Sequence, residues 1–194
     1  IDEVIETLII AIALVIAVVF VFLGDWRTTL IPGIAIPVSL IGTFAALAVF
    51  GFSLNTIVLF ALILAIGIVV DDAIIVVENV QRLMDEEDLE PKEATTKAME
   101  QVGGAVIATT LVLLAVFVPV GFMPGITGEL YKQFAVTISV AVAISSINAL
   151  TLSPALCVVL LKKGSQPMSL LAGFNRWFER LTARYTAGVR LVIK

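Results

Sequence analysis

Long apolar segments without lysine or arginine are the feature that most limits how this chain of 194 residues can fold. Five such segments occur, at about residues 7–23, 30–50, 54–77, 104–123 and 133–161. A helix that crosses a bilayer needs about 17–25 mostly apolar residues, and each segment is long enough. Because lipid offers backbone groups no hydrogen-bond partner, such segments span as helices. We predict an all-α fold: a polytopic membrane helical bundle with five transmembrane helices, in a block over residues 1–163.

The composition excludes an ordinary soluble domain. The chain is 60% hydrophobic and only 14% charged, whereas soluble domains carry about 25% charged residues. It has no histidine and one cysteine, Cys157, which leaves no histidine metal site, imidazole relay or internal disulfide. We therefore predict no catalytic residue, no metal site, no organic cofactor and no nucleic-acid partner.

The basic residues indicate which side of the membrane each connection occupies. Of the twelve lysines and arginines, all except Lys132 fall on the side that holds Arg27, the 82–97 region and the tail from Lys162 onward. Cytoplasmic connections carry the excess of basic residues in membrane proteins. We therefore predict an external N-terminus and a cytoplasmic C-terminus.

Two polar segments are predicted to lie on the cytoplasmic surface. Residues 78–103 have Pro91 at a plausible helix start and Gly103-Gly104 at its end, which predicts a short surface helix that acts as a solvated connector. Residues 168–194 place aromatic side chains on one helical face and arginines on the other. A basic amphipathic helix of this kind lies in the headgroup plane and favours anionic lipid. We interpret it as an anchor or spacer that leads to a further membrane block.

Asp71 and Asp72 stand side by side within the 54–77 segment. An aspartate near the centre of a spanning helix costs about 2.5–3.5 kcal/mol on insertion scales, so an adjacent pair requires a reason. The commonest role of such carboxylates is to take up and release protons, or to hold a cation, during transport. We predict that Asp71 and Asp72 form a proton relay. Two alternatives are polar contacts that merely join helices, and a sodium site.

The five apolar segments offer this aspartate pair no positive charge. Their hydroxyl and amide groups can donate hydrogen bonds but cannot neutralise a carboxylate. The candidate donors are Thr109, Thr110, Ser139, Ser145, Ser146, Asn148 and Thr151. Either at least one aspartate is protonated, or a lysine or arginine reaches the pair from helices outside this chain.

Residues 67–80, GIVVDDAIIVVENV, resemble the fourth transmembrane helix of the resistance–nodulation–division (RND) multidrug exporters, in their hydrophobe/amphiphile efflux branch of the acriflavine-resistance type. The resemblance continues in register along nearly the whole chain. It includes RTTLIP at 27–32, GFSLNT at 51–56, PKEAT at 91–95, YKQF at 131–134 and SPALC at 153–157. An ordered series of this kind is far more specific than the aspartate pair alone.

The resemblance implies a trimeric drug/proton antiporter of the bacterial inner membrane, with a periplasmic N-terminus in this chain. It implies coupling to a periplasmic adaptor and an outer-membrane channel. The proton-carrying aspartates of the family match Asp71 and Asp72, and their lysine, arginine and threonine partners lie on helices of the second half. By this resemblance the chain corresponds to helices two to six and the amphipathic helix of the N-terminal half.

Two other functions remain open from the sequence. One is a protein-export accessory of the same superfamily, which also uses intramembrane acids. The other is a non-transporting helical module that packs against other membrane proteins. In that case neutralising Asp71 and Asp72 leaves the partner's function intact.

Overall fold

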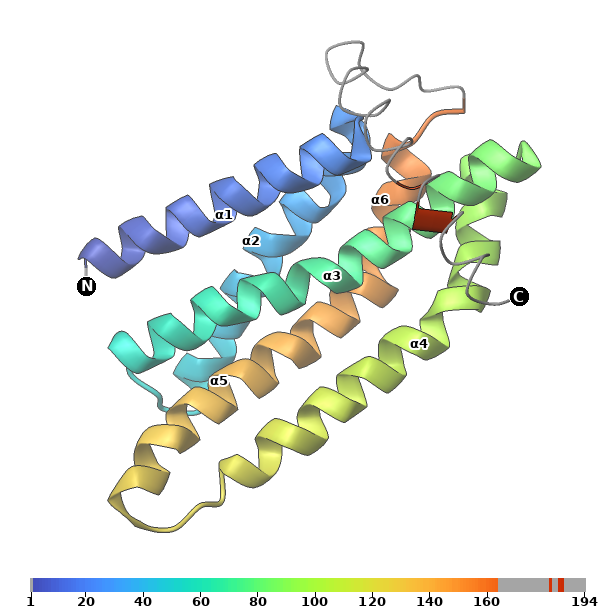
Figure 1. Cartoon of the computed structure of the whole chain (residues 1–194). Coiled ribbons are helices and arrows are strands. Elements are labelled where there is room, and N and C mark those ends of the chain that lie inside the picture. The colour runs from blue at the N-terminus through green and yellow to red at the C-terminus, as the bar shows by residue number, and fades with distance from the viewer. Residues whose placement is uncertain (1, 164–181, 183–184, 187–194) are drawn as a thin grey trace.

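The computed structural model describes residues 2–163, 182, 185 and 186 of the chain. Within these residues every regular element is a helix (Figure 1). The helices are α1 (Asp2–Leu23), α2 (Trp26–Val49), α3 (Thr56–Glu87), α4 (Pro91–Val120), α5 (Gly125–Leu150) and α6 (Leu152–Leu160). Five stretches are long and apolar enough to cross a membrane, the last being α5 and α6 together. The predicted all-α, polytopic bundle is confirmed. Nearly all of the predicted interfacial helix, residues 168–194, lies outside the described residues.

Successive helices run up and down, so that their connections collect at two ends of the bundle. The α1–α2 and α3–α4 connections lie at the same end as the close of α6 (Figure 1). The N-terminus and the α2–α3 and α4–α5 connections lie at the opposite end. This arrangement separates the same two sets of connections that the distribution of lysine and arginine separates in the sequence.

Local capping explains where two of the helices begin. Asp25 precedes α2, and its carboxylate accepts hydrogen bonds from the Arg27 backbone and the Thr28 hydroxyl, each at 3.2 Å. Asn55 precedes α3, and its side-chain oxygen accepts from the backbone nitrogens of Ile57 and Val58 at 3.0 Å. Such caps satisfy backbone donors that have no partner within the helix.

α3 is the central helix of the bundle. It contacts each of the other five helices of the described chain, and α5 lies alongside it for most of its length (Figure 1). Small residues permit this approach, because Ala61 and Ala65 on α3 are fully buried and Ala65 shares a core cluster with Ala141 of α5. α1, in contrast, is the least enclosed of the five spans, because only 6% of the residues in its most apolar stretch are buried.

The prediction of a separate surface helix within 78–103 is wrong. α3 continues past the apolar segment to Glu87, and α4 begins at Pro91 and runs through Gly103 and Gly104 without a break. The reason is that both extensions keep an apolar face, whose buried members include Leu83, Met84, Ala94 and Ala98. Packing of this kind overrides the cost of about 1 kcal/mol for a glycine inside a helix.

Polar contacts hold the same hairpin on its outer side. The Arg82 guanidinium donates to Asn79 at 2.7 Å and to Gln101 at 3.1 Å, and Lys97 pairs with Glu87. The region is therefore a helical hairpin that extends the bundle beyond its apolar part. Pro91 is the helix start that the sequence predicts, at the first turn of α4.

The fifth predicted span differs from the structure at its start and in its interior. α5 begins at Gly125, whereas the sequence predicted a start at residue 133. The helix is interrupted at Thr151, where α6 follows with a changed backbone (φ −124°, ψ −63°). Pro154 explains the interruption, because it has no N–H to donate to Leu150 and its ring crowds that carbonyl.

A substitution at Gly128 tests the close backbone approach in the turn between α4 and α5. A Cβ at this position would lie 2.0 Å from the Met123 carbonyl oxygen. We expect Gly128→Ala to reduce the free energy of unfolding by about 1–3 kcal/mol, the usual cost of overpacking. Thermal unfolding of the purified protein in detergent measures the change.

The matched control is Gly104→Ala, because a Cβ on Gly104 meets nothing within 4 Å. It should leave stability unchanged or raise it by up to about 1 kcal/mol, the difference in helix propensity. Equal melting temperatures for both variants would contradict the proposed close approach at Gly128.

Candidate functional site

The aspartate pair lies in the middle of α3, the helix that contacts all the other helices of the described chain. Asp72 is buried, with 8% of its surface exposed, whereas Asp71 is exposed in the described part of the chain. Neighbouring positions on an α-helix point about 100° apart, so the two carboxylates have different surroundings. Asp72 faces into the bundle and Asp71 faces out of it.

Ser145 of α5 is the hydrogen-bond partner of Asp72. Its hydroxyl lies 2.8 Å from Asp72 Oδ2, and it is also 3.1 Å from the Val69 carbonyl oxygen. Ser145 is itself buried, with 2% exposure. The contact ties the centre of α3 to the C-terminal part of α5, but a hydroxyl donates one proton and brings no positive charge.

Asp71 belongs to an uncovered stripe along α3. The stripe consists of exposed residues at helical spacing: Phe60, Leu64, Gly67, Asp71, Ile75 and Glu78. Asp71 makes no hydrogen bond or ion pair with any residue that the structure describes. Because most of the stripe is apolar, its surroundings in a membrane must be lipid or other protein, and neither lipid nor an apolar helix stabilises an ionised carboxylate.

Among the seven predicted donors, the structure brings only Ser145 to the pair. Three threonines bond to their own helices instead: Thr109 and Thr110 to the Val106 carbonyl, and Thr151 to the Ile147 carbonyl. Asn148 donates across the bundle to the Ser39 hydroxyl of α2 at 2.8 Å. Ser146 is buried but does not contact Asp72, and the Ser139 hydroxyl is without a partner among the described residues.

The sequence reasoning missed two polar contacts between helices. One is the Ser39–Asn148 hydrogen bond, and the other joins the Asn55 amide to Gln133 Oε1 at 2.5 Å. The position of Asn55 before an apolar run predicts a helix cap, but it gives no indication of Gln133. Both contacts form only through the packing of α2 and α3 on α5.

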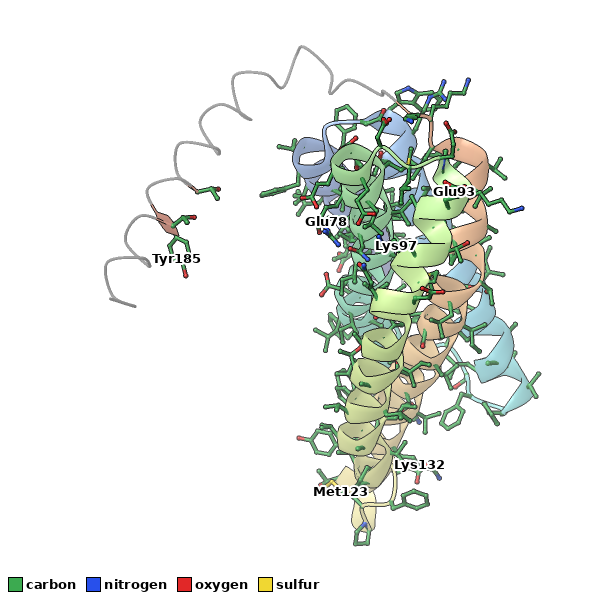
Figure 2. The ribbon with its side chains drawn as sticks, turned by 90° about the vertical axis from the view of Figure 1, so that its right-hand side faces the viewer. Glu78, Glu93, Lys97, Met123, Lys132 and Tyr185 are labelled. Carbon is green, nitrogen blue, oxygen red and sulfur yellow. The ribbon has the colours of Figure 1, made fainter. Side chains whose placement is uncertain are left out.

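The ion pairs of the described chain all lie near the ends of the bundle, away from the aspartate pair. They join Arg82 to Glu86, Lys97 to Glu87, Lys132 to Glu129, and Lys163 to Asp88 and Glu90. Figure 2 shows Glu78, Glu93 and Lys97 towards one end of the bundle and Lys132 at the other. Within residues 2–163, therefore, no lysine or arginine pairs with Asp71 or Asp72.

The geometry gives little support to a cation site at the pair. The described residues hold no group of three or more histidine, cysteine, aspartate or glutamate side chains that could bind a metal ion. Sodium sites in transporters use broken helices whose free carbonyls coordinate the ion. α3 runs without interruption through both aspartates, so its carbonyls stay in the helical hydrogen-bond pattern.

Comparison with known proteins decides the family. The model of the AcrB/AcrD/AcrF family matches residues 1–194, the full length of the sequence. The chain belongs to this family. The resemblance to RND multidrug exporters, drawn from the motifs around Asp71 and Asp72, is confirmed.

Relatives within the family are close to this chain but much longer. The multidrug resistance protein MdtF of Escherichia coli K12 is 47% identical over 198 residues, which cover 100% of this chain and 19% of MdtF. The multidrug export protein AcrF of the same strain is 50% identical, with the same coverage. The toluene efflux pump membrane transporter TtgB of Pseudomonas putida is 50% identical over 93% of this chain and 17% of its own length. The chain thus spans about a fifth of the length of these family members.

Ser145→Ala tests whether the α5 hydroxyl sets the environment of Asp72. We expect the substitution to shift the infrared carboxyl band that Asp72→Asn removes, because the carboxyl loses its hydrogen-bond donor. We also expect a loss of about 1–3 kcal/mol in unfolding free energy, the cost of leaving a buried polar group unpaired. Difference infrared spectra of the purified protein and its thermal unfolding give the two readouts.

Ser146→Ala is the matched control for this experiment. Ser146 is the next residue of α5 and is also buried, at 7% exposure, but it does not contact Asp72. It should leave the Asp72 band in place. Identical spectra for the two alanine variants would show that Ser145 does not hold Asp72.

Proposed function

We propose that this chain is the part of a proton-driven multidrug efflux transporter that carries its proton-relay residues, Asp71 and Asp72. The observation that carries the proposal is an adjacent pair of carboxylates at the centre of the most enclosed helix. One carboxylate has a hydroxyl partner, and among the described residues no lysine or arginine pairs with either. Family membership supports it, because the relatives are named as multidrug and solvent exporters. On this proposal the protein is a secondary transporter, not an enzyme.

The energetics of the site favour a group that changes its protonation state. An ionised carboxylate away from water is expensive unless a cation compensates it, and a protonated one is far less so. Such a site has two acceptable states: both charges present as an ion pair, or the carboxyl protonated and the cation released. Transfer of one proton therefore selects between two arrangements of the surrounding helices.

The two aspartates have different parts in this scheme. Asp72 is fixed to α5 through Ser145, so its position is tied to the bundle core. Asp71 lies on the uncovered stripe of α3, where a helix from outside this chain can approach it. We propose that the remainder of the same transporter covers this stripe and brings a lysine or arginine to the pair. Protonation then weakens the attraction between α3 and the covering helices.

The wider assembly follows from the same proposal. The transporter would be a multi-pass protein of the bacterial inner membrane and a homotrimer that works with a periplasmic adaptor and an outer-membrane channel. The end of the bundle that carries Arg82, Lys92, Lys97 and Lys163 would be cytoplasmic, since basic residues favour that side. The N-terminus of α1 would then be periplasmic. Membrane lipid surrounds the rest of the apolar surface.

The alternative functions are less well supported. A protein-export accessory of the same superfamily does not agree with the names of the relatives, which are multidrug, toluene and solvent exporters. A non-transporting packing module does not require aspartate at these positions, because asparagine would form the same hydrogen bond to Ser145 at a lower insertion cost. The experiment below separates that module from a transporter.

Single substitutions of the aspartates test the proposal. In the full-length protein that carries this chain, we expect Asp71→Asn and Asp72→Asn each to remove proton-driven drug export. The loss should be roughly a hundredfold or more in rate, because a positioned proton-transfer group contributes about 10²–10⁴-fold. Export of a fluorescent drug from proteoliposomes under an imposed pH gradient measures the effect.

Asp85→Asn provides the control, since it removes the same charge from an exposed position near the end of α3. Export should remain close to the unsubstituted level in this variant. Equal expression and an unchanged size-exclusion profile show that assembly survives in all three variants. Full export by either aspartate variant under these conditions would refute the relay and favour the packing module.

A further inference from the structure

An apolar groove opens at the end of the bundle opposite the α3–α4 hairpin. It lies between the end of α2, the end of α4 and the first half of α5, and its volume is about 360 Å³. Its walls include Phe50, Phe52, Phe117, Phe122, Val136 and Val140. We call it the phenylalanine groove. Its size falls within the range of about 300–1,000 Å³ that is typical of small-molecule sites.

The groove faces the surroundings of the bundle and not its interior. Phe50 and Phe122, which follow the ends of α2 and α4, are 64% and 81% exposed. Because the helices span a membrane, these rings meet lipid at the level where the helices leave the apolar layer. An occupant of the groove is therefore drawn from the bilayer.

Lys132 places a positive charge at the edge of the groove. Its side chain forms part of the groove wall in the first half of α5, at the same end of the bundle as Met123 (Figure 2). The lysine is the basic residue that the sequence assigns to this side of the membrane, with all the others on the opposite side. Its neighbour Glu129 is 3.8 Å from Nζ, a long and exposed pair that leaves the ammonium free to bind another anion.

A second polar group lies in the same wall. The Ser139 hydroxyl is buried and has no hydrogen-bond partner among the described residues. It is two helical turns from Lys132, or about 10 Å at 1.5 Å per residue. Because this oxygen is buried, an occupant of the groove meets apolar surface at that depth.

From these contacts we propose that the phenylalanine groove binds one anionic phospholipid, with its phosphate on Lys132 and an acyl chain along the phenylalanine rings. Lysine binds phosphate as a point charge, and apolar walls suit a hydrocarbon chain. The combination of one cation at the end and an apolar length matches an amphiphile and not a helix of another protein.

Three other surface grooves lack this combination. The groove between α1 and α2 is lined by residues such as Ala13, Phe20 and Trp26, with no charged group in its wall. The groove between α1 and α3 carries both Glu78 and Arg82, and the groove between α4 and α6 carries both Glu100 and Lys92. Among these four grooves, a lysine without an acidic residue in the same wall therefore distinguishes the phenylalanine groove.

Native mass spectrometry of the full-length protein tests the proposal. The protein is equilibrated with equal amounts of phosphatidylglycerol and phosphatidylcholine of identical acyl chains, and the lipid retained per protomer is counted. We expect preferential retention of phosphatidylglycerol, and Lys132→Gln should lower it by about fivefold, the effect of one lysine near an anionic lipid. Lys92→Gln, which removes a lysine at the opposite end, is the control and should leave retention unchanged.

Two further variants separate the head and the chain of the lipid. Lys132→Arg keeps the charge and should retain phosphatidylglycerol, whereas Val140→Phe fills the groove and should lower retention with Lys132 in place. A normal size-exclusion profile confirms that each variant is folded. Equal retention by the Lys132→Gln and Lys92→Gln proteins, or full retention by Val140→Phe, overturns the proposal and points to a groove covered by another part of the protein.

Discussion

The structure depends on one constraint: within a bilayer, a polar group must find its hydrogen-bond partner inside the protein. Most hydroxyls of the described bundle find a partner within their own helix. Thr43, Thr110 and Thr137 each donate to a carbonyl one turn earlier in their own helix, at 2.7 Å. Such groups add little to the attraction between helices, because they are satisfied before the helices meet. Contacts that cross between helices are therefore few and specific.

Asp71 and Asp72 are the carboxyl groups within the apolar segments of the described bundle, and neither has a counter-charge there. Asp72 has the Ser145 hydroxyl, and Asp71 has no described partner. An enclosed helix could avoid this cost simply by carrying apolar residues at both positions. The arrangement is understandable if the pair exchanges a proton and a counter-charge, since both processes need a carboxylate that its own bundle leaves incompletely satisfied. The uncovered stripe of α3 indicates a missing packing partner, just as the carboxylates without a cation indicate a missing electrostatic partner.

Much of the fold could be predicted from the sequence. The five spans follow from apolar length alone, and the separation of Asp71 from Asp72 follows from the angle between neighbouring helical positions. The helical continuation of α3 and α4 was less accessible, because its surface is polar and Gly103-Gly104 resembles a helix end. Its signal was the apolar spacing of Leu83, Met84, Ala94 and Ala98, which the charged neighbours obscured. The choice of Ser145 over Ser139 and Ser146 was not accessible at all. That choice depends on the register of α5 against α3, which only three-dimensional packing defines.

The unbroken course of α3 has a mechanical consequence. The helix runs for 32 residues, with the aspartate pair near its middle and the tip of the α3–α4 hairpin at Glu87. From Asp71 to Glu87 the rise is about 24 Å, so a tilt of about 10° around the pair would displace the tip by about 4 Å. No proline or interruption within α3 absorbs such a movement. The hairpin, which the contacts of Arg82 and Lys97 hold together, would move with α3 as a rigid body. A movement around the aspartates in the bilayer would therefore displace a surface that lies in water.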